Sequence, residues 1–159
     1  MMENIVMCRI DFRLIHGQVI TKWLRYYPAK KVVIVDNMLS EDDFMAEIYK
    51  MAAPQGLILE ILNEQEVESY LAQNKETIFL LFKDIPTGHR FVKKGHVLRE
   101  MVVGGVPSEA GRKLVFSGVY LDQADFERLV EVEQMGTQVS FSSTPDDKSL
   151  KLASIKGLF

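Results

Sequence analysis

Short apolar runs alternate with amphipathic segments along this chain, and this alternation limits the folds open to it more than any other feature. Runs rich in β-branched and aromatic residues cover 5–10, 32–35, 57–62 and 78–82, and a later one covers 139–141. Such runs are typical of strands buried on both faces. They predict an α/β fold, a single three-layer domain over residues 1–159 with a mainly parallel twisted sheet and helices on both faces.

Helices are expected between the apolar runs. Residues 40–43 have the pattern of a capping box, which predicts a helix that runs to Ala53. Phe44, Ile48 and Met51 have helical spacing and are predicted to form the buried stripe of that helix. Further helices are predicted over 64–72 and 87–94, after Gly17, and after a capping Asp122.

Composition excludes several classes of function. The formal net charge of −3 gives no general attraction to nucleic acid or anionic lipid, so we expect no nucleic-acid partner. The single cysteine, Cys8, lies in an apolar run, which indicates a core residue in a reducing compartment. His16, His89 and His96 lack the spacing of zinc ligands, so no metal is expected. His89 and His96 are predicted at the surface.

The end of the first predicted strand carries the strongest chemical signal. Arg9, Asp11, Arg13, His16 and Gly17 lie within nine residues, just before a predicted helix. In a parallel α/β sheet, ligands bind at the carboxyl ends of the strands. The N–H groups at a helix start attract anions, and arginines add charge-assisted hydrogen bonds to phosphate. The segment therefore predicts a site for a phosphoryl group.

His16 is the residue best suited to accept that group. Near neutral pH, much of a histidine population is neutral imidazole, with a free lone pair on one ring nitrogen for in-line attack. Phosphoryl transfer needs mainly positioning and charge stabilisation, which Arg9 and Arg13 can supply. Asp11 can orient the imidazole or restrain an arginine, and it can equally be a loop residue. Asp11 and Asp36 are the acids that can satisfy the two arginines.

The eleven residues from Arg9 to Val19 strongly resemble the signature of the IIB subunit of the mannose–fructose–sorbose class of sugar phosphotransferase systems. The resemblance continues downstream. Residues 33–37 resemble the second strand of that family and its turn, 80–83 the end of the fourth strand, and 103–105 with 111–113 the glycine-containing segment that follows. Residues 119–122 resemble the entry to the last long helix. The match covers nearly the whole chain.

The resemblance implies a function. His16 matches the histidine that accepts a phosphoryl group from phosphohistidine on a IIA partner and passes it to a sugar hydroxyl during uptake through IIC and IID membrane subunits. It implies transfer through Nδ1 of the ring, with no cofactor, because the N–P bond of the donor already carries the transfer potential. The chain would then be a component of a protein–phosphohistidine–sugar phosphotransferase, cytoplasmic and peripherally associated with its membrane subunits. The sugar and the oligomeric state stay open, a homodimer included.

The resemblance also extends the list of site residues. Arg9 and Arg13 match the phosphate loop of the family, with Asp11, Gly17 and Gln18 as support. Residues at neighbouring strand ends are predicted to border the site: Asp36, Lys83, Gly104 and Gly105. Two departures stand out. Phe12 stands where many members have a second acid, and residues 106–108 replace a stretch that often begins with methionine.

Three other functions use the same class of fold. A phospho-acceptor receiver domain needs an acceptor Asp after the third strand, where this chain has Asn63 and Glu64, and paired acids after the first, where Phe12 follows Asp11. A nucleotide-binding enzyme needs a glycine-rich phosphate loop there, and the sequence contains neither a Walker A motif nor GxGxxG. A regulatory module that is phosphorylated but no longer serves transport stays open as the alternative.

Overall fold

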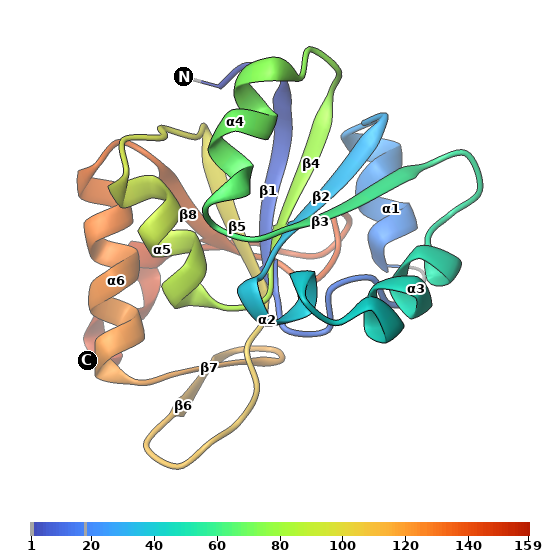
Figure 1. Ribbon diagram of the computed structural model, residues 1–159. Coiled ribbons are helices and arrows are strands. Elements are labelled where there is room, and N and C mark those ends of the chain that lie inside the picture. Colours follow the sequence, from blue (N-terminus) through green and yellow to red (C-terminus); the bar gives the residue numbers. More distant parts are fainter. Residues whose placement is uncertain (1, 18) are drawn as a thin grey trace.

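A parallel sheet with helices on both faces forms the protein, as the apolar runs predicted (Figure 1). The computed structural model describes residues 2–17 and 19–159. The strands of the main sheet are β1 (Ile5–Asp11), β2 (Lys31–Val35), β3 (Ile58–Leu62), β4 (Ile78–Phe82), β5 (Glu100–Gly105), β8 (Gln138–Phe141) and β9 (Leu150–Lys151). The helices are α1 (Val19–Tyr26), α2 (Asn37–Ser40), α3 (Asp43–Ala52), α4 (Glu66–Gln73), α5 (Ile85–Lys93), α6 (Gln123–Gln134) and the 3₁₀ helix η1 (Leu152–Leu158). A hairpin of β6 (Lys113–Phe116) and β7 (Val119–Leu121) stands apart from the sheet.

The strands are ordered β3-β2-β4-β1-β5-β8-β9. Every pairing in this sheet is parallel except that of β8 with β9. β1 leads to a helix on one face, whereas its neighbours β4 and β5 lead to helices on the other. The connections diverge around the end of β1, and that divergence opens the crevice in which such sheets bind ligands.

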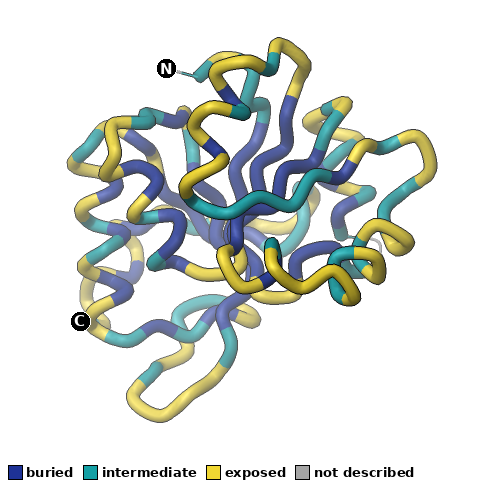
Figure 2. The backbone as a smooth tube through the Cα atoms, viewed as in Figure 1, coloured by how far each residue is buried: buried dark blue, intermediate teal, exposed yellow. Residues whose placement is uncertain are grey.

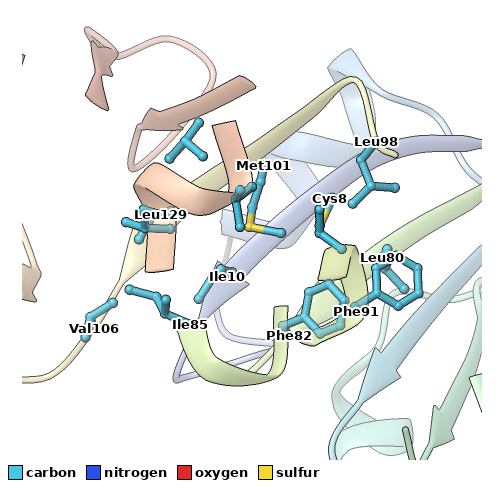
Figure 3. Close-up of a cluster of buried hydrophobic side chains, with 14 of the residues drawn as sticks. Cys8, Ile10, Leu80, Phe82, Ile85, Phe91, Leu98, Met101, Val106 and Leu129 are labelled. Carbon is cyan, nitrogen blue, oxygen red and sulfur yellow. The ribbon is translucent and has the colours of Figure 1, made fainter. Parts of the chain in front are cut away.

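Two hydrophobic clusters separate the layers of the fold. On one face, strand side chains pack against α4, α5 and α6; Figure 3 shows Ile10 and Met101 of the strands meeting Ile85 and Leu129 of the helices. On the other face, α1, α2 and α3 cover the sheet. Alternate residues of one strand serve opposite faces, so the fully buried strands read as continuous apolar runs. Figure 2 shows these strands as the buried centre of the molecule.

The edge of the sheet departs from the prediction that every strand is buried on both faces. β3 is an edge strand, and its first residue, Ile58, is 46% exposed. The sequence also did not reveal β5, because this strand begins with a charged Glu100 and ends in two glycines. Its apolar part is only Met101–Val103, which is too short to signal a strand alone.

The helix predicted to open at residues 40–43 begins differently. Ser40 ends the short helix α2, and Asp42 is the N-cap of α3, accepting a hydrogen bond from the backbone N–H of Met45 at 3.0 Å. The predicted buried stripe is also wrong. Phe44, Ile48 and Met51 are 75%, 42% and 82% exposed, while the stripe one residue along packs against the sheet.

Helical spacing cannot distinguish the two faces of α3 because both carry apolar residues at that spacing. Met45, Tyr49 and Ala53 form the stripe that packs against the second cluster. Which stripe faces inward is set by packing against the sheet, a tertiary effect that hydrophobic periodicity does not contain.

The orientation of α3 can be tested with two neighbouring residues. Met45→Ala is expected to lower the free energy of unfolding by about 1 kcal/mol or more, because it removes packed methylene groups, and Phe44→Ala is expected to change it by less than about 0.5 kcal/mol. Urea titration followed by circular dichroism measures both. A larger loss for Phe44→Ala would mean that α3 faces the other way.

Candidate functional site

The loop after β1 is fixed to its strand by backbone hydrogen bonds. Within the loop, the N–H of Arg13 donates to Oδ1 of Asp11 and the N–H of Leu14 donates to the Asp11 carbonyl, both at 3.0 Å. The N–H of Phe12 donates to the carbonyl of Gly105 in β5 at 3.1 Å. The chain therefore makes a tight turn directly at the carboxyl edge of the sheet, and the loop is held from both sides.

Burial sets the rest of the loop's path. Leu14 and Ile15 are 2% and 6% exposed and belong to the cluster that α1 and α3 cover. Leu14 has φ +58°, a left-handed conformation that bulky residues rarely adopt, and Gly17 has φ +46°. Such backbone persists only where packing determines it, and it is concentrated at functional sites. The result is that His16 follows two buried residues and has a side chain that is 20% exposed.

The carboxylate of Asp11 is the centre of the site. Asp11 is fully buried, and three side chains reach its two oxygens. Arg13 donates from Nε to Oδ1 and from Nη2 to Oδ2, both at 3.1 Å. Nε2 of His16 lies 3.1 Å from Oδ2, and Nη2 of Arg9 lies 3.4 Å from the same oxygen. The prediction that Asp11 orients the imidazole or restrains an arginine thus understates its contacts, because it contacts His16 and both arginines.

These contacts determine the tautomer of His16. Burial opposes the charged form of Asp11, but the hydrogen bonds from Arg13 and the charges of Arg9 and Arg13 outweigh it and hold the pKa of Asp11 below its usual range. An ionised carboxylate accepts hydrogen bonds and cannot donate one. Nε2 of His16 must therefore carry the proton and donate it to Asp11, which leaves the lone pair of the neutral ring on Nδ1.

Arg9 is buried beneath the site. It is 2% exposed, and its guanidinium donates to the carbonyls of Ser142 and Ser143 at 2.8 and 2.9 Å. Burial lowers the pKa of Arg9 to about 10, with Asp11 acting in the opposite direction, so the side chain keeps its charge at neutral pH. This burial does not agree with the direct phosphate contact suggested for Arg9 by the sequence.

Trp23 of α1 is a part of the site that the sequence did not reveal. Its ring lies 4.8 Å from the guanidinium carbon of Arg9, and its Nε1–H donates to the carbonyl of Ser143 at 3.1 Å. Stacking on an indole face stabilises a desolvated guanidinium. Sequence spacing predicts Trp23 only as a core residue of α1, and backbone carbonyls more than a hundred residues away leave no sequence signal.

Arg13 has the exposure that Arg9 lacks. Its side chain is 44% exposed, and its guanidinium carbon lies 5.6 Å from the centre of the Phe12 ring. The paired contact with Asp11 uses Nε and Nη2, so Nη1 lies outside that pair. The ring face of Phe12 thus supports the guanidinium of Arg13.

Two glycines at the end of β5 make room for the charged cluster. A Cβ atom on Gly105 would lie 2.6 Å from Oδ1 of Asp11 and 3.2 Å from Nη2 of Arg13. A Cβ on Gly104 would collide with the guanidinium of Arg9. Any side chain at either position must displace the groups that hold Asp11, so these two predicted border residues lie directly against the site.

The other predicted border residues line a neighbouring hollow. Asp36 and Lys83 face a hollow of about 270 Å³ together with Phe12, Met38, Pro107 and Arg112. Asp36 is also the N-cap of α2, and its carboxylate accepts from the N–H of Leu39 at 2.9 Å, so it is not the partner of an arginine that the sequence suggested. Gly17 lies two residues before the start of α1 at Val19, and the predicted support residue Gln18 lies outside the described residues.

Comparison with known proteins identifies the family of this chain. The family model "PTS system sorbose subfamily IIB component" matches residues 5–157. The chain belongs to the sorbose subfamily of phosphotransferase-system IIB components. The crystal structure of manxB from Thermoanaerobacter tengcongensis is similar, with a TM-score of 0.92 and 33% identity over 98% of this chain and 96% of that one.

Two further relatives agree with this assignment. The IIBSor domain of the sorbose permease from Klebsiella pneumoniae has a TM-score of 0.88 and 27% identity, covering 97% of this chain and 96% of its own. The sorbose-specific EIIB component of Lacticaseibacillus casei is 30% identical over 148 residues, which span 91% of this chain and 90% of that protein. The similarity thus covers both proteins almost entirely.

Outside the Asp11 cluster, this IIB component offers its histidines no comparable surroundings. His89 and His96, predicted at the surface, are partly buried and pair with Glu131 and Glu68 at 3.0 and 3.1 Å. Within residues 2–17 and 19–159, no group of three or more metal-binding side chains converges. None of the helices in the same ranges is long and apolar enough to cross a membrane.

The Asp11 cluster predicts a specific dependence of stability on pH. Because the folded-state pKa of Asp11 lies below its unfolded value, its ionisation stabilises the fold above about pH 4, and this contribution is lost as the pH falls through the folded pKa. Asp11→Asn is expected to lower the free energy of unfolding at pH 7 by about 3 kcal/mol, since it leaves buried Arg9 without its carboxylate.

The difference between wild type and Asp11→Asn should begin to shrink as the pH falls below about 4, where the carboxyl of the unfolded wild type takes up a proton, and should level off below the folded-state pKa of Asp11. Urea unfolding at a series of pH values measures this, with Asp43→Asn as the control for an exposed acid. A difference that stays constant down to the lowest pH would show that the charge of Asp11 is not what holds the cluster together.

Proposed function

We propose that His16 of this IIB component accepts a phosphoryl group from phosphohistidine on a IIA partner and passes it to a sugar hydroxyl during uptake through IIC and IID subunits. The observation that carries the proposal is the contact between Nε2 of His16 and Oδ2 of Asp11 at 3.1 Å. It fixes one ring nitrogen as a donor and leaves Nδ1 as the nucleophile. Membership of the phosphotransferase-system IIB family supports the same reading.

In the first transfer, the lone pair of Nδ1 attacks the phosphorus atom in line with the N–P bond of the donor. That bond breaks, and its electron pair stays on the donor's imidazole nitrogen. The ring of His16 keeps its Nε2 proton and becomes positively charged as the new N–P bond forms. The carboxylate of Asp11, already bonded to Nε2–H, stabilises that charge, as a carboxylate does for the histidine of a catalytic triad.

In the second transfer, a sugar hydroxyl oxygen attacks the same phosphorus atom from the opposite side. The N–P bond of His16 breaks, its electron pair returns to Nδ1, and the hydroxyl gives up its proton to a base at the acceptor site. His16 is then again neutral with its proton on Nε2. No nucleotide or metal is required, because the N–P bond of the donor supplies the transfer potential.

The two arginines have different roles in this proposal. Arg13 is exposed beside Asp11 and offers Nη1 to the phosphoryl oxygens, where a guanidinium stabilises the charge of the transferring group. Arg9 is a positioning residue that holds Asp11 from below. The start of α1, two residues after Gly17, adds the partial positive charge of a helix N-terminus.

Replacing the acceptor tests the proposal directly. Incubation with a phosphorylated IIA protein of this class is expected to label wild type on His16, and His16→Ala should take up no label while remaining folded. Mass spectrometry of peptides kept at neutral pH locates the group, with His89→Ala and His96→Ala as controls that should label normally. The phosphate should be acid-labile and base-stable, as an N–P bond is; an acid-stable phosphate, or label on His89 or His96, would contradict the assignment.

Phosphoryl transfer from labelled His16 to sugar separates transport from regulation. Membranes that contain the IIC and IID subunits, with a panel of sugars that includes sorbose, should discharge the phosphorylated protein. A protein that is labelled but never discharged by its own membrane subunits would favour the regulatory alternative.

The role of Arg13 is tested by the rate at which phosphorylated IIA labels His16. Arg13→Ala is expected to slow single-turnover labelling on the order of 100-fold, as the loss of one charge-stabilising donor does, with a smaller effect on folding because the side chain is 44% exposed. Arg25→Ala, which changes an exposed arginine of α1, is the matched control. Rapid-quench kinetics measures both variants, and equal rates would remove Arg13 from the mechanism.

A further inference from the structure

Helix α3 presents an apolar face to solvent. Phe44, Ile48 and Met51 follow one another at helical spacing and are 75%, 42% and 82% exposed, and we call these three side chains the α3 face. Met38 of α2 is 84% exposed and comes from the element just before it. Four of the ten large hydrophobic side chains exposed in the described ranges thus lie within residues 38–51. A concentration of this kind marks an interaction site more often than isolated exposed residues do.

The α3 face lies at the same edge of the sheet as the loop that carries His16. In Figure 1, α2 and α3 lie at the lower edge, where β1 also ends, and Figure 2 shows the two helices as largely exposed. The inner stripe of α3, Met45 and Tyr49, packs on the cluster that contains Leu14 and Ile15 of the loop. Met38 lines the hollow that Phe12 also lines. A protein bound to the α3 face would lie beside His16.

Charge limits what can bind there. Residues 37–53 contain the four acids Glu41, Asp42, Asp43 and Glu47 and one base, Lys50, so this segment alone carries the formal net charge of −3 of the whole chain. All five side chains are exposed. We call the four acids the acidic rim of the α3 face. This rim repels an anionic lipid surface, and it repels a second copy of the same face because the two carry like charge. The complementary partner is a protein surface that is apolar and basic.

We propose that the α3 face docks the cytoplasmic loops of the IIC and IID membrane subunits, a proposal that rests on the function proposed above. Cytoplasmic loops of membrane proteins carry an excess of Lys and Arg, which complements the acidic rim. Interfaces that persist are more apolar than those of transient encounters. The α3 face therefore suits the membrane subunits better than a IIA donor that binds and leaves in each cycle.

The test separates docking from phosphorylation. Phe44→Ser/Met51→Ser removes the two most exposed side chains of the α3 face. Leu158→Ser is the matched control, because Leu158 is 45% exposed and belongs to η1, which packs on the hydrophobic cluster of the opposite face of the sheet. Inside-out vesicles that contain the cognate IIC and IID subunits are sedimented with each variant. The double variant is expected to bind at least about tenfold more weakly than wild type, which corresponds to about 1.4 kcal/mol. The control should bind normally.

Labelling of His16 by phosphorylated IIA in solution is measured in parallel. The double variant should be labelled at the wild-type rate. If wild type is not labelled, the proposed function fails; if wild type is labelled and the double variant binds the vesicles as wild type does, only the docking proposal fails. A double variant that binds vesicles normally but is labelled slowly would assign the α3 face to the donor instead.

A second variant tests the rim without removing apolar surface. Glu47→Lys places a base between Phe44 and Met51 on the helix surface and is expected to weaken vesicle binding and reduce its dependence on salt. Equal binding to anionic lipid vesicles that lack IIC and IID would overturn the proposal. So would a wild-type dimer in analytical ultracentrifugation that Phe44→Ser/Met51→Ser dissociates.

Discussion

The carboxylate of Asp11 is the interaction on which the site depends. It is fully buried and contacts Arg9, Arg13 and His16, and the hydrogen bonds and charges of the two arginines keep it ionised there. An isolated buried carboxylate would neutralise itself by a rise in pKa, and the buried guanidinium of Arg9 would be costly without an acidic partner. Each group therefore requires the others. This mutual requirement fixes the position of the imidazole of His16, whose side chain is 20% exposed.

The cluster in turn requires a particular sheet. Arg9 and Asp11 are two residues apart on β1, so their side chains lie on the same face of that strand, and the neighbouring strand must leave space beside them. β5 provides it by ending in Gly104 and Gly105. Glycine weakens a strand, and its presence at the end of a central strand indicates close approach of other groups. The feature that conceals β5 from pattern analysis is thus the feature that accommodates the charged cluster.

The sequence predicted the parts of the structure that depend on local order. The strands with continuous apolar runs are predictable because burial on both faces requires an apolar residue at every position. The loop after β1 is predictable as a site because its charged residues are close together in the sequence. Contacts between distant segments left no such trace. The carbonyls of Ser142 and Ser143 that hold Arg9 belong to a loop after β8, and any residue type offers a carbonyl. The inward face of α3 was missed for a related reason, because two apolar stripes share one helix and only packing chooses between them.

In the proposed function, the balance of charge favours both the uptake and the release of a phosphoryl group. Before transfer, Arg9 and Arg13 exceed Asp11 by one positive charge, with His16 neutral. A phosphoryl group on Nδ1 brings about two negative charges, and the ring that keeps its Nε2 proton brings one positive charge, so the cluster becomes close to neutral. Neither state leaves a large uncompensated charge beside the buried carboxylate. Phe12 beside Arg13 adds an aromatic face and no charge, so it does not alter that balance.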